Sequence, residues 1–277
     1  MPEGPETRRV ADKLASAIVG KKVIKLMFAQ PHLKQWQAAF NNMTVASLDT
    51  YGKAIVTRFV DSDRSKALNI YTHNQLYGRW VICAANQVPP TKRQLRLGIY
   101  TREQWALLYS ASDIFVLSDK EVPEHPFIKK LGRDVLSAET TLDYVIDRLL
   151  SATYRKRQIG GFLTEQSFLA GLGNYLRCEI LFVAGILPWR KPVELQKQQI
   201  QKLAETILRL PRQAYQSESI TNDLDTAKTL MAQGSSLEEA RFWVFRREGL
   251  KCYRCGNLII SKKSAGQVCY LCEKCQK

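Results

Sequence analysis

Four cysteines near the end of the chain constrain its fold more than any other feature of the sequence. Cys252 and Cys255 form one pair, Cys272 and Cys275 form another, and sixteen residues separate the two pairs. Each pair can present two thiolates on one turn, and two such turns close a tetrahedral zinc site. An iron centre and redox-active pairs are the alternatives. Because four protein ligands leave no open coordination position, we expect structural Zn2+, with residues 259–270 as a hairpin that the metal holds.

The charge balance indicates the kind of partner. The chain of 277 residues carries 41 Lys and Arg against 26 Asp and Glu, which gives a net charge of +15. This excess favours a polyanionic partner, nucleic acid first and an acidic membrane surface second. No apolar run reaches membrane-spanning length, and the start resembles no signal peptide or presequence. We therefore expect a cytoplasmic protein whose remaining cysteines, Cys83, Cys178 and Cys269, pack as small apolar groups.

The pattern of apolar residues changes partway along the chain. A helix is expected at 7–20, followed by eight short strand-like runs with a spacing of about ten residues that ends at residue 117, which predicts a β-sandwich or barrel. Beyond 121–126, apolar stripes with helical period appear at 142–150 and 200–210. The fold class is therefore α+β with two domains. We expect an N-terminal domain at 1–124, a helical domain at 125–240 that includes a mobile insert at 217–240, and a metal-binding hairpin at 241–277.

The first six residues, Met1-Pro2-Glu3-Gly4-Pro5-Glu6, can carry covalent chemistry. Removal of Met1 would leave Pro2 with a secondary amine that is partly neutral at pH 7 and can act as a nucleophile. Its attack on a sugar C1′ would give a cationic iminium, and Glu3 could transfer protons. The alternative is an ordinary chain start in which two prolines precede a helix.

Three turns carry further candidate residues. Lys53 follows a glycine at a tight turn and is either a phosphate or proton-transfer group or a solvated charge. Gln75, Leu76 and Tyr77 form a trio that could wedge into a base stack, or else Leu76 and Tyr77 pack inside. Asn174 could cap a helix whose amides would suit a phosphate, or it marks an ordinary helical corner.

In this order, MPEGPE, YGK, FLAGLGNYLR and the paired cysteines resemble the formamidopyrimidine-DNA glycosylase and endonuclease VIII family of bifunctional DNA repair enzymes. The resemblance covers nearly the whole chain. HNQLYG and SASDI are similar to endonuclease VIII, which favours oxidised pyrimidines. The resemblance implies an N-terminal β-sandwich with flanking helices, a helical helix-two-turn-helix domain that ends in a zinc-finger hairpin, and a monomer acting on damaged double-stranded DNA.

The resemblance also implies a role for each candidate. Pro2 would displace the damaged base and form a Schiff base with C1′, Glu3 would transfer protons, and Lys53 would contact phosphate and assist β-elimination. Asn174 would bind phosphate, and Lys130 stands where family members often carry an arginine at the DNA backbone. The trio Gln75, Leu76 and Tyr77 would fill the gap left by the flipped nucleotide.

One position departs from the family pattern. The family places an arginine five residues before the third cysteine, and this chain has Gln267 there. A neutral amide binds phosphate more weakly than a guanidinium and cannot act as a cationic proton donor. We expect β-elimination to persist and base removal or δ-elimination to be slower, unless Lys262 or Lys263 compensates. A DNA-damage binding protein that does not cut, and a purine-preferring glycosylase of the same family, are the alternative functions.

Overall fold

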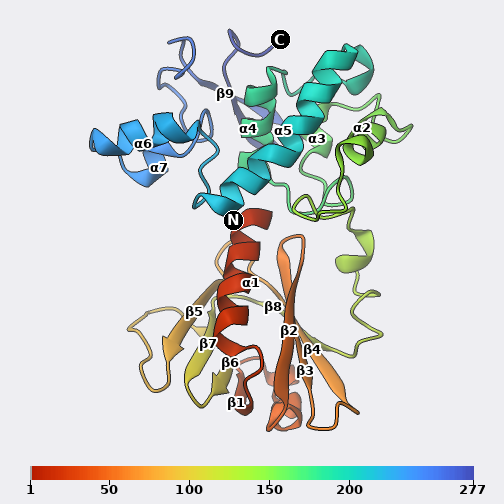
Figure 1. The fold of residues 1–277 in the computed structure, drawn as a ribbon, viewed down its shortest axis with the longest axis vertical. Coiled ribbons are helices and arrows are strands. Elements are labelled where there is room, and N and C mark those ends of the chain that lie inside the picture. Colours follow the sequence, from red (N-terminus) through yellow and green to blue (C-terminus); the bar gives the residue numbers. More distant parts are fainter. Residues whose placement is uncertain (1) are drawn as a thin grey trace. The chain divides into compact units, whose positions relative to one another are not determined.

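The computed structural model describes residues 2–277, and the chain divides into two compact units (Figure 1). The first unit contains Pro2 and Glu6–Lys130, and the second contains Glu3–Pro5 and Leu131–Lys277. Within residues 2–277 no helix is long and apolar enough to cross a membrane. The three-part division expected from the sequence stays a prediction.

The first unit is built from two antiparallel sheets of four strands each, in the orders β1-β6-β7-β5 and β2-β3-β4-β8. All eight predicted strands are present, with ends within three residues of the expected ones. Their bounds are β1 Val23–Phe28, β2 Thr44–Tyr51, β3 Ala54–Val60, β4 Ala67–His73, β5 Arg79–Ala84, β6 Leu95–Thr101, β7 Gln104–Tyr109 and β8 Asp113–Leu117. Buried residues from both sheets join in a single apolar cluster, as the prediction of a sandwich requires.

Helix α1 (Gly4–Ile18) begins three residues earlier than predicted. Pro5 does not prevent this, because the first turn of a helix needs no backbone N–H from proline. Leu14 and Ile18 of α1 are buried in the cluster of the first unit. The 3-10 helix η1 (Pro31–Phe40), which the sequence did not reveal, adds Phe40, whose ring lies 4.9 Å from that of Phe59 in an edge-to-face contact.

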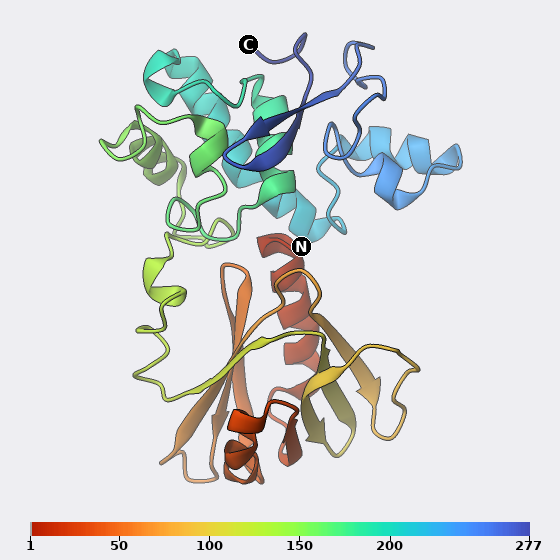
Figure 2. The same ribbon diagram turned by 180° about the vertical axis from the view of Figure 1, so that it is seen from behind.

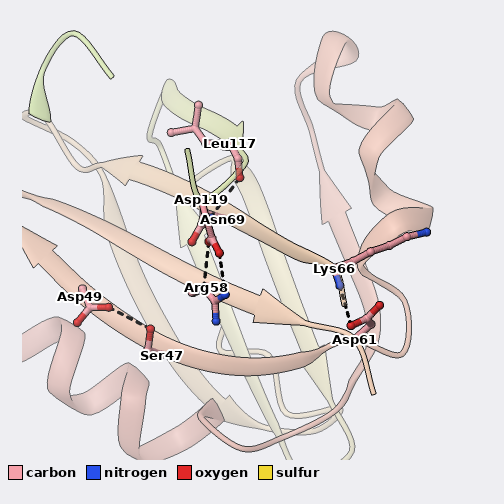
Figure 3. Close-up of polar contacts among 8 residues, drawn as sticks. All are labelled: Ser47, Asp49, Arg58, Asp61, Lys66, Asn69, Leu117 and Asp119. Atoms are coloured by element: carbon pink, nitrogen blue, oxygen red, sulfur yellow. Dashed lines mark hydrogen bonds and ion pairs between the residues drawn. The ribbon is translucent and has the colours of Figure 1, made fainter. Parts of the chain in front are cut away.

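Polar side chains also join neighbouring strands of the second sheet. The Arg58 guanidinium of β3 donates to both carboxylate oxygens of Asp119, at 3.0 and 2.7 Å. Asn69 of β4 donates to the same carboxylate at 2.8 Å. Figure 3 shows that the three side chains converge across neighbouring strands.

The second unit is mainly helical and surrounds α4 (Asn174–Ala184), which is buried from Tyr175 to its end. The hairpin of β9 and β10 lies against α4, as Figure 2 shows in dark blue over green. The 3-10 helix η2 (Ile128–Lys130) ends the first unit. The other elements of the second unit are α2 Leu142–Leu150, α3 Ile159–Phe162, η3 Pro192–Glu194, α5 Lys197–Gln216, α6 Leu224–Ala232, α7 Leu237–Ala240, β9 Ile260–Ser264 and β10 Gln267–Leu271.

Residues 217–240, expected as a mobile insert, contain two capped helices, and the expected mobility stays a prediction. The Asp223 carboxylate accepts the Thr226 N–H at the start of α6 (2.9 Å), and Ser236 and Glu239 form a capping box at the start of α7. Both caps have sequence signatures, an Asp before a helical run and Ser-x-x-Glu. The sequence analysis did not predict the two helices, because the segment has a mostly polar composition.

Candidate active site and metal centre

Glu3 occupies the N-terminus of helix α4 in the second unit. One oxygen of its carboxylate accepts the Tyr175 N–H at 2.8 Å, and the other accepts the Leu176 N–H at 3.3 Å. The side chain is only 3% exposed. Because the free N–H groups of a helix start carry partial positive charge, this position stabilises a carboxylate and fixes its orientation.

Two glycines make this arrangement possible. A Cβ at Gly173 would lie 2.4 Å from the carboxyl carbon of Glu3, and a Cβ at Gly4 would lie 2.9 Å from the Cα of Gly171. The Gly4 N–H also donates to the Gly171 carbonyl at 2.8 Å. The two backbones therefore approach more closely than any larger residue would permit.

The expectation that Asn174 caps α4 is wrong. The N-cap residue is Gly173, which has no side chain, and Asn174 is already the first residue of the helix. The Glu3 carboxylate supplies the missing cap from a distant part of the chain. The Asn174 side chain instead donates to the Val268 carbonyl at 3.0 Å and accepts from Arg177.

Arg177 is a fully buried arginine whose role the sequence analysis missed. Its guanidinium donates to the carbonyls of Gly160 (3.1 Å), Ser264 (3.0 Å) and Val268 (3.2 Å). Ser264 and Val268 flank the hairpin tip, so Arg177 fixes the tip to α4. An arginine inside a largely apolar helical run was the available signal, because a buried charge requires partners.

Glu179, two residues further along α4, is a second buried charge that was missed. Its carboxylate accepts the backbone N–H groups of Trp243 (2.8 Å), Val244 (2.9 Å) and Phe245 (2.9 Å) and the Thr221 hydroxyl (2.7 Å). Four donors to one carboxylate hold the chain after α7 against α4. This is a structural role, and it lies outside the predicted site.

Gln267 begins β10 directly after the hairpin turn and is exposed. The turn residues Ala265 and Gly266 both have positive φ, as a tight two-residue hairpin turn requires. Of the two lysines expected to compensate, Lys262 forms an ion pair with Glu273, whereas Lys263 is exposed and lies opposite Val268 in the hairpin.

The four C-terminal cysteines converge as the spacing predicted. Their sulfur atoms all lie within 4.8 Å of one another, with Cys252 and Cys275 3.9 Å apart and Cys255 and Cys272 3.5 Å apart. A tetrahedron with Zn–S bonds of about 2.3 Å has S–S edges of about 3.8 Å, so these distances fit a four-thiolate site. In the part of the chain that the structure describes, this is the one cluster suited to a metal ion.

In the first unit, Lys53 follows Gly52 in the turn between β2 and β3, where Gly52 has a φ of 59°. Lys53 is only 7% exposed, so the alternative of a solvated lysine is wrong. Its neighbour His73 ends β4 opposite Ala54. Burial lowers the pKa of His73, the Asp113 carboxylate opposes this shift, and the Lys53 charge adds to it. A neutral His73 can therefore accept the Gln75 N–H at Nδ1, 3.0 Å away.

The loop after β4 holds Leu76 and Tyr77 outward. They are 63% and 71% exposed, so the alternative in which they pack inside is wrong. The Gly78 N–H donates to the Asn74 carbonyl at 2.7 Å, and a Cβ at Gly78 would lie 2.6 Å from the same oxygen. Gln75 takes a left-handed φ of 49° to complete this tight turn.

The predicted site residues fall into two groups. The structure assigns Pro2, Lys53, Gln75, Leu76, Tyr77 and Lys130 to the first unit. It assigns Glu3, Asn174, Gln267, Cys252, Cys255, Cys272 and Cys275 to the second. Pro2 is half-buried, and Lys130 is exposed at the end of η2.

These features define a class: α+β proteins in which a two-sheet unit is followed by a helical unit that ends in a four-cysteine hairpin. Residues 1–112 match the family model of the formamidopyrimidine-DNA glycosylase N-terminal domain, and residues 131–225 match that of the formamidopyrimidine-DNA glycosylase H2TH domain. The chain belongs to the formamidopyrimidine-DNA glycosylase and endonuclease VIII family, whose members are DNA glycosylases with AP lyase activity.

Curated relatives support this membership over the full length. Endonuclease 8 of Enterobacter sp. (strain 638) is 41% identical over 277 residues, and that of Klebsiella pneumoniae subsp. pneumoniae is 42% identical over 276, with complete coverage of both chains in each case. Among solved structures, Lactococcus lactis Fpg in complex with abasic-site DNA has a TM-score of 0.79 at 23% identity and 99% coverage of both chains. MutM in complex with DNA containing carbocyclic 8-oxo-G has a TM-score of 0.79 at 22% identity and complete coverage of both chains. These structures confirm the predicted fold.

Proposed function

We propose that this protein removes oxidised bases from damaged double-stranded DNA and then cleaves the resulting abasic site. The observation that carries the proposal is the position of Glu3. The residue next to Pro2 is a buried carboxylate held by two helix N–H groups, and Gly173 is needed to admit it. A carboxylate in such a position is organised for proton transfer rather than for solubility.

The chemistry proposed for the chain start follows from this arrangement. After removal of Met1, the Pro2 amine attacks C1′ of the damaged nucleotide, the bond to the base breaks, and an iminium forms. Glu3 transfers the protons that the sugar and the departing base require. The iminium then acidifies C2′, so that loss of a proton there expels the 3′ phosphate by β-elimination, with Lys53 as phosphate contact and assisting group.

Other predicted residues would hold the DNA. Nucleotide flipping is required because an amine cannot reach C1′ inside an intact stack, and the exposed Leu76 and Tyr77, with Gln75, would fill the gap. An asparagine amide has two N–H donors. The Asn174 amide donates one of these N–H groups to the Val268 carbonyl, so the other can bind phosphate. Lys130 would contact the backbone.

The four thiolates would hold a zinc ion, which when bound joins the two cysteine turns into one rigid knuckle. Cys252, Cys255, Cys272 and Cys275 then keep the hairpin and its Gln267 in place. We further infer that the protein acts as a monomer in the bacterial cytoplasm, as its relatives are bacterial proteins.

Borohydride trapping tests the covalent step. Reduction of the iminium on abasic duplex should give a stable protein–DNA adduct, and peptide mapping should locate it at Pro2. A matched sample that retains Met1 should give no adduct. An adduct on a lysine, or none from protein shown to begin at Pro2, would favour a protein that binds damage without cutting.

We also propose a preference for oxidised pyrimidines, based on the relatives named endonuclease 8 and on the HNQLYG loop. Competition between a thymine glycol duplex and an 8-oxoguanine duplex measures this preference directly.

Gel analysis of the incised DNA ends tests the role of Gln267. We expect mainly the β-elimination product, and Gln267→Arg should increase the 3′-phosphate product of δ-elimination. Abundant 3′ phosphate from the unaltered protein at normal excision rates would contradict this assignment.

A further inference from the structure

Two cysteines outside the zinc cluster face each other in the second unit. Cys178 of α4 and Cys269 of β10 are both buried, and their sulfur atoms lie 3.7 Å apart although 91 residues separate them in sequence. A disulfide has an S–S bond of about 2.05 Å, so the two sulfur atoms need to approach by about 1.7 Å. The bond would therefore require rotation about the two Cα–Cβ bonds and a small shift of β10.

The surroundings give the two thiols different properties. The Tyr270 N–H donates to the Cys178 sulfur at 3.4 Å, and the Cys178 thiol in turn donates to Cys269. That hydrogen bond and the Arg177 guanidinium lower the pKa of Cys269, whereas burial raises the pKa of Cys178. Cys269 is therefore the better nucleophile, and Cys178 is placed to respond as the second, resolving thiol.

We propose that Cys178 and Cys269 form a reversible disulfide, a modification site that links α4 to the hairpin when the protein meets a peroxide. Both thiols are buried, so peroxide reaches them only when β10 moves locally away from α4, against the hydrogen bonds that Arg177 makes to Ser264 and Val268. Opening exposes Cys269, and closing returns it to Cys178.

The reaction balances with hydrogen peroxide as the oxidant. The Cys269 thiolate attacks one peroxide oxygen, the O–O bond breaks, and the departing hydroxide takes a proton to become water. The resulting sulfenic acid is then attacked by the Cys178 sulfur, the S–O bond breaks, and hydroxide leaves as water with the Cys178 proton. Two thiols and one peroxide give one disulfide and two waters.

Mass spectrometry of the zinc-loaded, full-length protein tests the proposal. After treatment with hydrogen peroxide, free thiols are alkylated under denaturing conditions and the protein is digested without reductant. We expect the peptides containing Cys178 and Cys269 to be linked, two hydrogen atoms lighter than their sum, and separated again by a thiol reductant. Zinc content, measured on the same sample, should be unchanged.

Three variants serve as controls. Cys178→Ala and Cys269→Ala should each abolish the link, and Cys83→Ala, at a half-buried cysteine of β5, should leave it intact. The link should also raise the thermal midpoint by roughly 5–10 °C, because it closes a long loop, and the Cys178→Ala protein should show no such rise.

The proposal fails on any of three results. Peroxide could link the four zinc ligands and release the metal while Cys178 and Cys269 remain open to alkylation. It could oxidise Cys83 and leave the pair untouched. The linked protein could also melt at the same temperature as the reduced one, which would show that the bond does not hold the hairpin.

Discussion

At the scale of single residues, the Glu3 site depends on a missing side chain. The Glu3 carboxyl occupies the space that a Cβ at Gly173 would need, and the N–H groups of Tyr175 and Leu176 hold it there. The glycine is needed for space and not for backbone freedom, since its φ of −146° is open to any residue. The placement of Glu3, the proposed proton-transfer group, therefore depends on a glycine far away in the sequence.

Gly173→Ala should displace Glu3 and strongly reduce base excision. The overlap at 2.4 Å should also cost roughly 1–3 kcal/mol of stability. Excision assays and urea unfolding measure the two effects. Gly161→Ala is the matched control, because its Cβ would meet only Ala265 at an ordinary 3.6 Å. Equal activity in the two variants would contradict the assignment.

Glu3→Gln should abolish base removal but retain part of the strand cleavage at a preformed abasic site. The amide keeps a carbonyl for the Tyr175 N–H, yet it can no longer supply the proton for base departure. Parallel assays on damaged-base and abasic duplexes separate the two steps. Glu6→Gln, three residues along, should change neither. Equal loss of both activities in Glu3→Gln would count against the proposed role.

At the scale of elements, α4 organises the second unit through its two buried charges. Arg177 holds the hairpin, and Glu179 holds the chain that follows α7. A helix with apolar residues on every face would pack equally well in several rotations. These charged groups select one rotation, because only that one satisfies their partners.

Glu179→Gln should destabilise the protein by roughly 2–4 kcal/mol, because an amide NH2 would face backbone N–H donors that have lost their acceptor. Urea unfolding followed by tryptophan fluorescence measures the loss. Glu205→Gln on the exposed face of α5 provides the control and should be nearly neutral. An equally small effect at both positions would show that Glu179 is dispensable.

The cluster that joins β3 and β4 to the chain after β8 in Figure 3 should respond to acid. Hydrogen bonds from Arg58 and Asn69 lower the pKa of Asp119 to about 2. This contribution is present above the unfolded value of about 4 and disappears as the pH falls toward 2.

Asp119→Asn should therefore lower stability at pH 7, by less than about 1 kcal/mol because the pair is exposed, and have less effect near pH 2. Unfolding curves at both pH values test this, with the exposed Asp49→Asn of β2 as control. If Asp119→Asn lowered stability more near pH 2 than at pH 7, the ionised Asp119 carboxylate would not be the source of the stabilisation.

Sequence patterns predicted the elements better than the contacts between them. The eight strands and the cysteine cluster followed from spacing within short windows. The cap on α4 did not, since it comes from Glu3, 172 residues away. The burial of Lys53 and the exposure of Leu76 and Tyr77 also depend on tertiary packing that local composition leaves open.

At the scale of the whole molecule, a net charge of +15 should dominate binding to DNA. Each phosphate that the protein neutralises releases counterions, so affinity should fall linearly with salt on a logarithmic scale. With roughly 6–10 such contacts, binding should weaken by about 10³–10⁵ between 50 and 200 mM salt. Fluorescence anisotropy with undamaged and abasic duplexes measures both slopes. A flat response would exclude phosphate contacts as the main source of affinity.

The path of the chain also sets an order of events during its synthesis. Glu3 leaves the ribosome long before Tyr175 and Leu176, the residues that receive it. Under the roles proposed above, a translation product that stops before α4 therefore carries the Pro2 amine without its proton carrier in place. Incomplete chains should therefore remove no damaged bases.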